Sequence, residues 1–118
     1  MQFSRSPGCL QLLDTNLNQP DNTIMIVATC VVTLQLESVF SLKEKRSIIK
    51  PILTRLPRQF NVAVSEIDCQ DMWGTAVIGL VTIGTSAGYC HGLLEKAVAW
   101  IEDFRPDVPI NDYTIELF

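Results

Sequence analysis

Four stretches of this chain have the pattern of strands: apolar residues recur at alternate positions, and in one of the four both faces are apolar. These stretches cover residues 24–36, 61–68, 75–83 and 112–118. The first is the longest and is rich in β-branched residues, which favours a central position in a sheet. The last places Tyr113, Ile115 and Leu117 on the side that is expected to face the core.

Two longer stretches repeat their apolar residues every three to four positions, as amphipathic helices do. The first runs from Ser41 to Phe60, and Ser41 with Glu44 has the S-x-x-E spacing of a capping box. The second follows Ser86, a favoured N-cap residue, and is ended by the proline-containing segment 105–109. The order β-α-β-β-α-β predicts a ferredoxin-like α+β sandwich, in which two helices back a four-stranded antiparallel sheet.

Two residues disturb the pattern of the first helix. Pro51 lies in its interior, where a proline removes a hydrogen bond and costs about 3 kcal/mol. We therefore expect a kink or a restart there, which would turn Arg55 and Arg58 away from the earlier basic residues. Lys45 falls within the apolar arc, and we expect its ammonium group to extend outward to water.

The stretch at residues 75–83 is apolar on both faces. Ala76, Ile78 and Leu80 occupy one face, and Val77, Val81 and Ile83 occupy the other. A sheet with helices on one side would leave the second set in water. We therefore expect an internal segment or, more simply, a second copy of the chain to cover Val77, Val81 and Ile83, which predicts a homo-oligomer.

The composition is that of a folded globular protein. Apolar residues make up 47% of the 118 positions and charged residues 19%, and no apolar run reaches the ~18 residues of a membrane span. Residues 24–118 are expected to form a single domain, and the polar, turn-rich residues 1–23 a flexible N-terminal extension. The four cysteines form no C-x-x-C pair and no signal-peptide pattern is evident, so we expect reduced thiols, a cytoplasmic protein and no membrane partner.

Charge is distributed unevenly along the chain. The net charge is −4, yet residues 42–60 hold six basic residues and one acid, a local +5, while the other 99 residues hold three basic and twelve acidic ones. On the first helix, Lys43, Arg46 and Lys50 share a face, with Arg58 further round. These four residues are candidates for contact with RNA phosphates. A helix face that is merely solvated would show the same pattern.

The residues with catalytic or metal-binding potential form no convincing site. Glu66, Asp68 and Asp71 could hold a hard cation, but their spacing matches no metal-binding loop. Cys90 and His91 are neighbours on a helix and therefore point about 100° apart, which does not suit a nucleophile and its base. We accordingly expect no enzymatic activity, no cofactor and no metal.

Several segments together resemble the YlxP-like family of small bacterial proteins of unknown function. They are Ser41-Leu42-Lys43-Glu44-Lys45-Arg46, residues 60–66, Asp71-Met72-Trp73 and Gly79, within a match from about residue 25 to residue 118. The resemblance implies a cytoplasmic ferredoxin-like domain without an established activity, encoded among genes of translation and ribosome maturation. Members often carry polar residues after the tryptophan, where this chain has Gly74-Thr75.

Two functional hypotheses follow from these observations. The first is a non-enzymatic accessory protein that contacts RNA or the ribosome through Lys43, Arg46, Lys50 and Arg58. The second is a homo-oligomeric protein-binding module that uses the open sheet face around Val77, Val81 and Ile83. The two hypotheses are compatible with each other.

Overall fold

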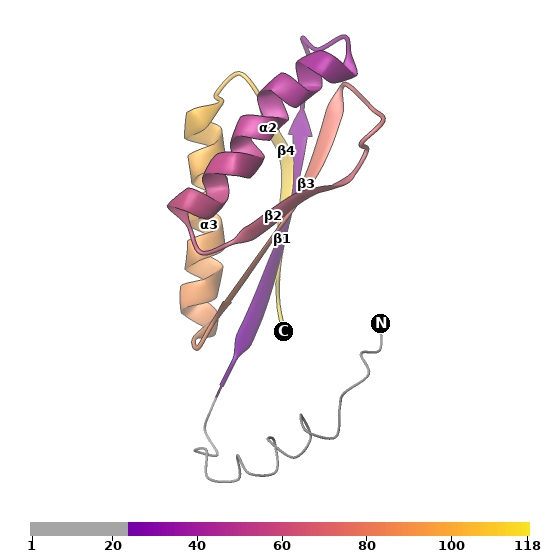
Figure 1. Cartoon of the computed structure of the whole chain (residues 1–118). Coiled ribbons are helices and arrows are strands. Elements are labelled where there is room, and N and C mark those ends of the chain that lie inside the picture. Colours follow the sequence, from indigo (N-terminus) through magenta and orange to yellow (C-terminus); the bar gives the residue numbers. More distant parts are fainter. Residues whose placement is uncertain (1–23) are drawn as a thin grey trace, which may run out of the picture.

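The computed structural model describes residues 24–118, in which four strands and two helices follow one another in the predicted order (Figure 1). The strands are β1 (Ile26–Gln35), β2 (Ala63–Asp68), β3 (Thr75–Gly84) and β4 (Ile110–Leu117), and the helices are α2 (Leu42–Gln59) and α3 (Ala87–Phe104). The extension predicted at residues 1–23 lies outside the described residues.

The strands form one antiparallel sheet in the order β2-β3-β1-β4, so the longest predicted strand is central. Both helices cover the same face of this sheet (Figure 1). This arrangement confirms the ferredoxin-like α+β fold. It also leaves the second face of the sheet uncovered by any element of residues 24–118.

The core lies between the sheet and the two helices. Alternate residues of β1 are completely buried, namely Ala28, Cys30, Val32 and Leu34. From the helices, Ile52 and Leu56 of α2 and Leu94 and Ile101 of α3 pack against this face and are also inaccessible to solvent. The alternating and helical patterns of the sequence therefore predict which side of each element is buried.

Helix α2 begins as predicted, but it does not restart at Pro51. The backbone N–H of Glu44 donates to Ser41 Oγ at 3.1 Å, which caps the helix. From there the helix is continuous to Gln59, with Pro51 and Pro57 inside it. Burial of Ile49, Ile52 and Leu56 along one side favours an uninterrupted helix, because only such a helix keeps all three against the sheet.

The edge strand β4 is oriented as predicted but is only partly covered. Tyr113, Ile115 and Leu117 pair with Val32, Cys30 and Ala28 of β1, whose side chains face the helices. Tyr113 and Leu117 are nevertheless 40% and 43% exposed. Their position at the edge of the sheet accounts for this, since neither helix extends over them fully.

Candidate functional site

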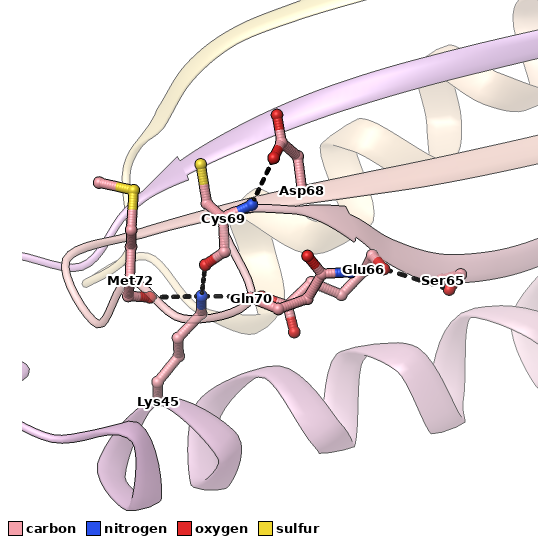
Figure 2. Close-up of polar contacts among 7 residues, drawn as sticks. All are labelled: Lys45, Ser65, Glu66, Asp68, Cys69, Gln70 and Met72. Atoms are coloured by element: carbon pink, nitrogen blue, oxygen red, sulfur yellow. Dashed lines mark hydrogen bonds and ion pairs between the residues drawn. The ribbon is translucent and has the colours of Figure 1, made fainter.

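Lys45 lies on the buried side of α2, and its ammonium group points inward, contrary to the expectation that it extends to water (Figure 2). The side chain is 3% exposed. Its Nζ donates to the carbonyl oxygens of Cys69 and Met72 at 2.6 and 2.5 Å and lies 2.7 Å from Glu66 Oε2. An ammonium group has three N–H donors, so these three oxygens match its donors in number.

The turn between β2 and β3 is shaped to provide these acceptors. Cys69 adopts a φ of 59°, in the left-handed region that non-glycine residues rarely enter. Its N–H bonds to Asp68 Oδ1 at 2.8 Å, and its carbonyl also accepts from the Met72 N–H at 3.0 Å. The resulting tight turn directs the Cys69 and Met72 carbonyls toward α2, where Lys45 binds both (Figure 2).

Glu66 completes this buried contact. Its Oε2 has no hydrogen bond of regular geometry among the described residues, although the Lys45 ammonium lies within 2.7 Å. The pairing is therefore mainly electrostatic, and each partner offsets the cost of burying the other's charge. We call Lys45, Glu66 and the two turn carbonyls the lysine clip. It joins the segments that carry the family resemblance, 41–46, 60–66 and 71–73.

The acidic residues considered as metal ligands have separate roles. Glu66 pairs with Lys45 and Asp68 bonds to the Cys69 N–H, while Asp71 is exposed. Within residues 24–118, no three His, Cys, Asp or Glu side chains are grouped as a metal ion would require. The structure thus does not bring Glu66, Asp68 and Asp71 together as one ligand set.

His91 is directed to a neighbour on its own helix rather than to Cys90. Its Nδ1 lies 3.1 Å from Glu95 Oε1, whereas Cys90 is buried in the core. Glu95 also accepts a 3.3 Å hydrogen bond from Tyr113 Oη on β4. The negative charge of Glu95 raises the pKa of Tyr113. These contacts tie β4 to α3 at the surface and offer no activated nucleophile.

The basic residues of α2 do form a shared surface. Lys43, Arg46, Lys50 and Arg58 are all exposed, and none has an acidic partner within 4 Å among residues 24–118. Arg46, Lys50, Arg55 and Arg58 line one shallow hollow of about 370 Å³. The expectation that Pro51 would separate Arg58 and Arg55 from the earlier residues is therefore wrong. We call these residues, with Lys43, the basic face.

Two of the basic residues also border the space between α2 and the neighbouring strand β2. This second hollow, of about 230 Å³, has an apolar floor of Leu42, Ile49 and Leu53. Arg46 and Lys50 line it together with Gln70. Since Arg46 and Lys50 belong to both hollows, they are the central residues of the basic face. Arg55 has an additional contact, with its guanidinium carbon 4.9 Å from the centre of the Phe104 ring.

The open face of the sheet has a hollow of its own. It measures about 450 Å³ and is lined mainly by apolar and small residues of β1, β2 and β3, among them Val31, Ala63, Ile67 and Val81. Gly79 lies within it, and a Cβ atom there would come within 3.0 Å of Ile67 Cγ2. In the single chain, Val77 and Val81 are half-buried and Ile83 is 52% exposed.

An aromatic pair was not predicted from the sequence. The rings of Phe40 and Trp73 meet edge to face, with their centres 6.1 Å apart. The two residues lie in different loops, 33 positions apart, and only the folded sheet brings them together. A tryptophan in a short polar loop was the one available signal, but it gave no indication of a partner.

Comparison with known proteins finds a matching family, a bacterial relative and a designed protein. The family described as "Protein of unknown function (DUF503)" matches residues 27–115. The uncharacterized protein YlxP of Bacillus subtilis (strain 168) is 41% identical over 64 residues, which are 54% of this chain and 70% of that protein. A de novo designed protein, Foldit4, covers 80% of this chain and 96% of its own, at 16% identity and a TM-score of 0.48.

The two helices of the described part of the chain were compared with the length and hydropathy of a membrane span. Neither α2 nor α3 is long and apolar enough to cross a bilayer. With the family match extending from β1 into β4, the chain belongs to the DUF503 family of proteins of unknown function.

Proposed function

We propose that this protein is a non-enzymatic accessory protein that binds RNA, free or within the ribosome, through the basic face of α2. The observation that supports the proposal most directly is the hollow bordered by Arg46, Lys50, Arg55 and Arg58. Four cations around one hollow, with no carboxylate within 4 Å among the described residues, are suited to an anionic ligand. The resemblance to a family encoded among translation genes agrees with this choice of anion.

The geometry of the basic face favours contact with phosphates over recognition of bases. Arg46 and Lys50 lie about one helical turn apart and Arg58 lies two turns further on, at about 5.4 Å per turn. Such a row can follow the sugar–phosphate backbone of one strand. The basic side chains of this face alone carry no information about sequence, because phosphate contacts position a protein without specifying bases.

Reversal of charge on the basic face is the test of this proposal. The triple variant Lys43→Glu, Arg46→Glu and Lys50→Glu should lose RNA or ribosome association, measured by fluorescence anisotropy with single-stranded RNA and by cosedimentation with ribosomes. A plot of log affinity against log salt concentration has a negative slope. If three contacts to a single strand are lost, this slope should become shallower by about two. The residues are exposed, so unfolding free energy should change by no more than about 0.5 kcal/mol per site.

A matched pair of single variants distinguishes the loss of a local contact from the effect of a changed net charge on binding. Lys50→Glu and Lys96→Glu each change the net charge by two and each replace an exposed helical lysine. Only Lys50→Glu should weaken binding. Equal effects of the two, or unchanged binding by the triple variant, would show that the basic face is only a solvated helix surface.

A second candidate function is supported by the open face of the sheet. The hollow at Gly79 and the neighbouring side chains of Val77, Val81 and Ile83 form an apolar area that no element of residues 24–118 covers. We infer a homo-oligomeric protein-binding module in which a second copy covers this face. This role does not compete with RNA binding, because α2 lies on the opposite side of the sheet (Figure 1).

A further inference from the structure

Phe40 and Trp73 are exposed aromatic residues in contact with each other, and the exposed Met72 precedes Trp73 in the chain. We call these three residues, which lie near the start of α2, the aromatic patch. The exposed fractions of Phe40, Met72 and Trp73 are 70%, 52% and 46%. The edge-to-face contact between Phe40 and Trp73 leaves much of both rings open to solvent. Single exposed apolar residues are ordinary, but two aromatic rings and a methionine gathered from two loops indicate an interaction surface.

The backbone that carries the aromatic patch is held in place before any partner arrives. The lysine clip binds the carbonyl of Met72, one of the three patch residues. On the other side of Trp73, the Leu36 N–H donates to the Gly74 carbonyl at 2.9 Å, which fastens the turn to the end of β1. A surface held in this way loses little conformational entropy on binding.

The charges around the aromatic patch are negative. The two loops that form it, residues 36–41 and 69–74, carry Glu37 and Asp71, both exposed, and contain no lysine or arginine. Asp68 adds an exposed carboxylate at the end of β2. Lys45 offers no free charge here because it is buried against Glu66. The first turn of α2 carries one exposed cation, Lys43, and one exposed carboxylate, Glu44, and so adds no net charge.

We propose that the aromatic patch is the docking site for a cationic segment of a partner protein, one whose arginine or lysine side chains lie against Trp73 and Phe40. The face of an indole ring attracts a cation, and guanidinium groups stack on it. The carboxylates of Glu37 and Asp71 supply the complementary charge at the rim. An RNA strand is disfavoured here because its phosphates would approach these same carboxylates. This site is therefore separate from the basic face and has the opposite preference.

The test uses a short synthetic peptide of alternating glycine and arginine as the probe. Binding to the full chain is followed by the indole N–H signals of Trp73 and Trp100 in ¹⁵N–¹H spectra, assigned with a Trp100→Phe variant. Trp100 stacks on Phe104 in α3 and provides an internal reference. The peptide should shift the Trp73 signal and leave the Trp100 signal in place. The same peptide with citrulline in place of arginine should bind about five- to tenfold more weakly.

Two substitutions and a matched control locate the site. Trp73→Leu and Asp71→Asn should each weaken peptide binding about three- to tenfold. Glu116→Gln removes the same charge from exposed β4 and should leave the affinity unchanged. Asp71 is exposed and its side chain forms no ion pair within residues 24–118, so its variant should fold normally even if Trp73→Leu does not.

Three results would overturn the proposal. One is equal binding of the arginine and citrulline peptides, and another is an equal effect of Asp71→Asn and Glu116→Gln. The third is a shift of the Trp73 signal by single-stranded RNA but not by the peptide, which would assign the aromatic patch to nucleobases. Because the basic face plays no part in these readouts, failure of the RNA-binding proposal would leave this one standing.

Discussion

At the scale of single residues, the lysine clip is the feature that most constrains the fold. Lys45 is a charged residue in an otherwise apolar arc of α2, and such a residue is stable there only if every donor is paired. Two carbonyl oxygens accept hydrogen bonds from its ammonium, and the Glu66 carboxylate lies within 2.7 Å as its countercharge. The clip thereby links α2 to β2 and to the turn that follows it, and it holds Met72 in the aromatic patch.

Removal of the Lys45 ammonium should be costly. Lys45→Met keeps most of the buried stem but leaves Glu66 Oε2 without its countercharge, and we expect a loss of about 3 kcal/mol in the free energy of unfolding. Lys43→Met is the matched control, since Lys43 is exposed and should change stability by less than about 0.5 kcal/mol. Urea denaturation at neutral pH measures both values.

A second substitution tests the cause of this loss. Adding Glu66→Gln to Lys45→Met removes the uncompensated charge and should restore part of the lost stability. If Lys45→Met is no worse than Lys43→Met, or if the double variant is as unstable as the sum of the singles, the clip does not stabilise the protein electrostatically.

Cys30 leads to a prediction about alkaline pH. Burial in the core, with a smaller contribution from the charge of Glu95, raises the pKa of its thiol from 9.0 to about 11. The unfolded chain therefore loses this proton at a lower pH than the folded chain does. Stability from this residue is complete below about pH 9 and is lost as pH rises toward 11, by up to about 2 kcal/mol.

The measurement compares the wild type with Cys30→Ala, whose stability cannot depend on this thiol. The difference in unfolding free energy between the two should be constant from pH 7 to pH 8.5 and should shrink toward pH 11. Titration of the other cysteines, lysines and tyrosines affects both proteins alike and cancels in the difference. A difference that stays constant up to pH 11 would mean that the Cys30 thiol ionises equally well in the folded protein.

The elements of the fold could be predicted because their signals are local. The Ser41–Glu44 cap spans four residues, and the alternation of β1 requires only its own sequence. Lys45 was misjudged because its acceptors are main-chain carbonyls 24 and 27 residues away, which any residue type could provide. The Phe40–Trp73 contact was missed for the same reason, since it depends on how two loops meet in the folded sheet.

Helix α2 shows how packing overrides a local signal. Pro51 lacks an N–H and was expected to interrupt the helix, yet α2 is continuous on both sides of it. Ile49, two residues before Pro51, and Ile52, directly after it, are both buried in the core. Their burial, at roughly 1.5–3 kcal/mol per large apolar side chain, is enough to offset the cost of the proline.

Replacement of Pro51 should therefore stabilise the protein. Pro51→Ala restores the missing N–H to a helix that already has the required geometry, and we expect a gain of about 1–2 kcal/mol in unfolding free energy, measured by urea denaturation. Thr54→Ala serves as a control for helix propensity alone, since Thr54 is exposed on the same helix and its gain should be about 0.5 kcal/mol. A Pro51→Ala variant less stable than the wild type would show that α2 depends on the fixed proline geometry.

At the scale of the whole molecule, the two faces of the sheet differ in what covers them. One face is covered by α2 and α3 (Figure 1). The residues of the basic face of α2 are exposed to solvent. The other face exposes valines, Ile67 and Ile83 around the hollow at Gly79. Acidic residues are concentrated on α3, β4 and the turn after β2, so the basic face is separated from most of the negative charge. Such a division allows assembly and RNA binding on separate surfaces.

Assembly through the open face can be tested with a single charge. Val81 borders the hollow at Gly79 and lies near the middle of β3, so Val81→Glu would place a carboxylate in any interface formed there. We expect the wild type to sediment as a dimer or larger species at micromolar concentration, and Val81→Glu to sediment as a monomer, because an unpaired charge buried between two apolar faces costs several kcal/mol.

Ala99→Glu introduces the same charge at an exposed position of α3 and should leave the assembly intact. Val81 is only half-buried in the single chain, so the variant should remain folded, and an unchanged circular dichroism spectrum would verify this. A wild type that is monomeric at high micromolar concentration, or an assembly that Ala99→Glu disrupts and Val81→Glu does not, would exclude the open face as the contact between copies.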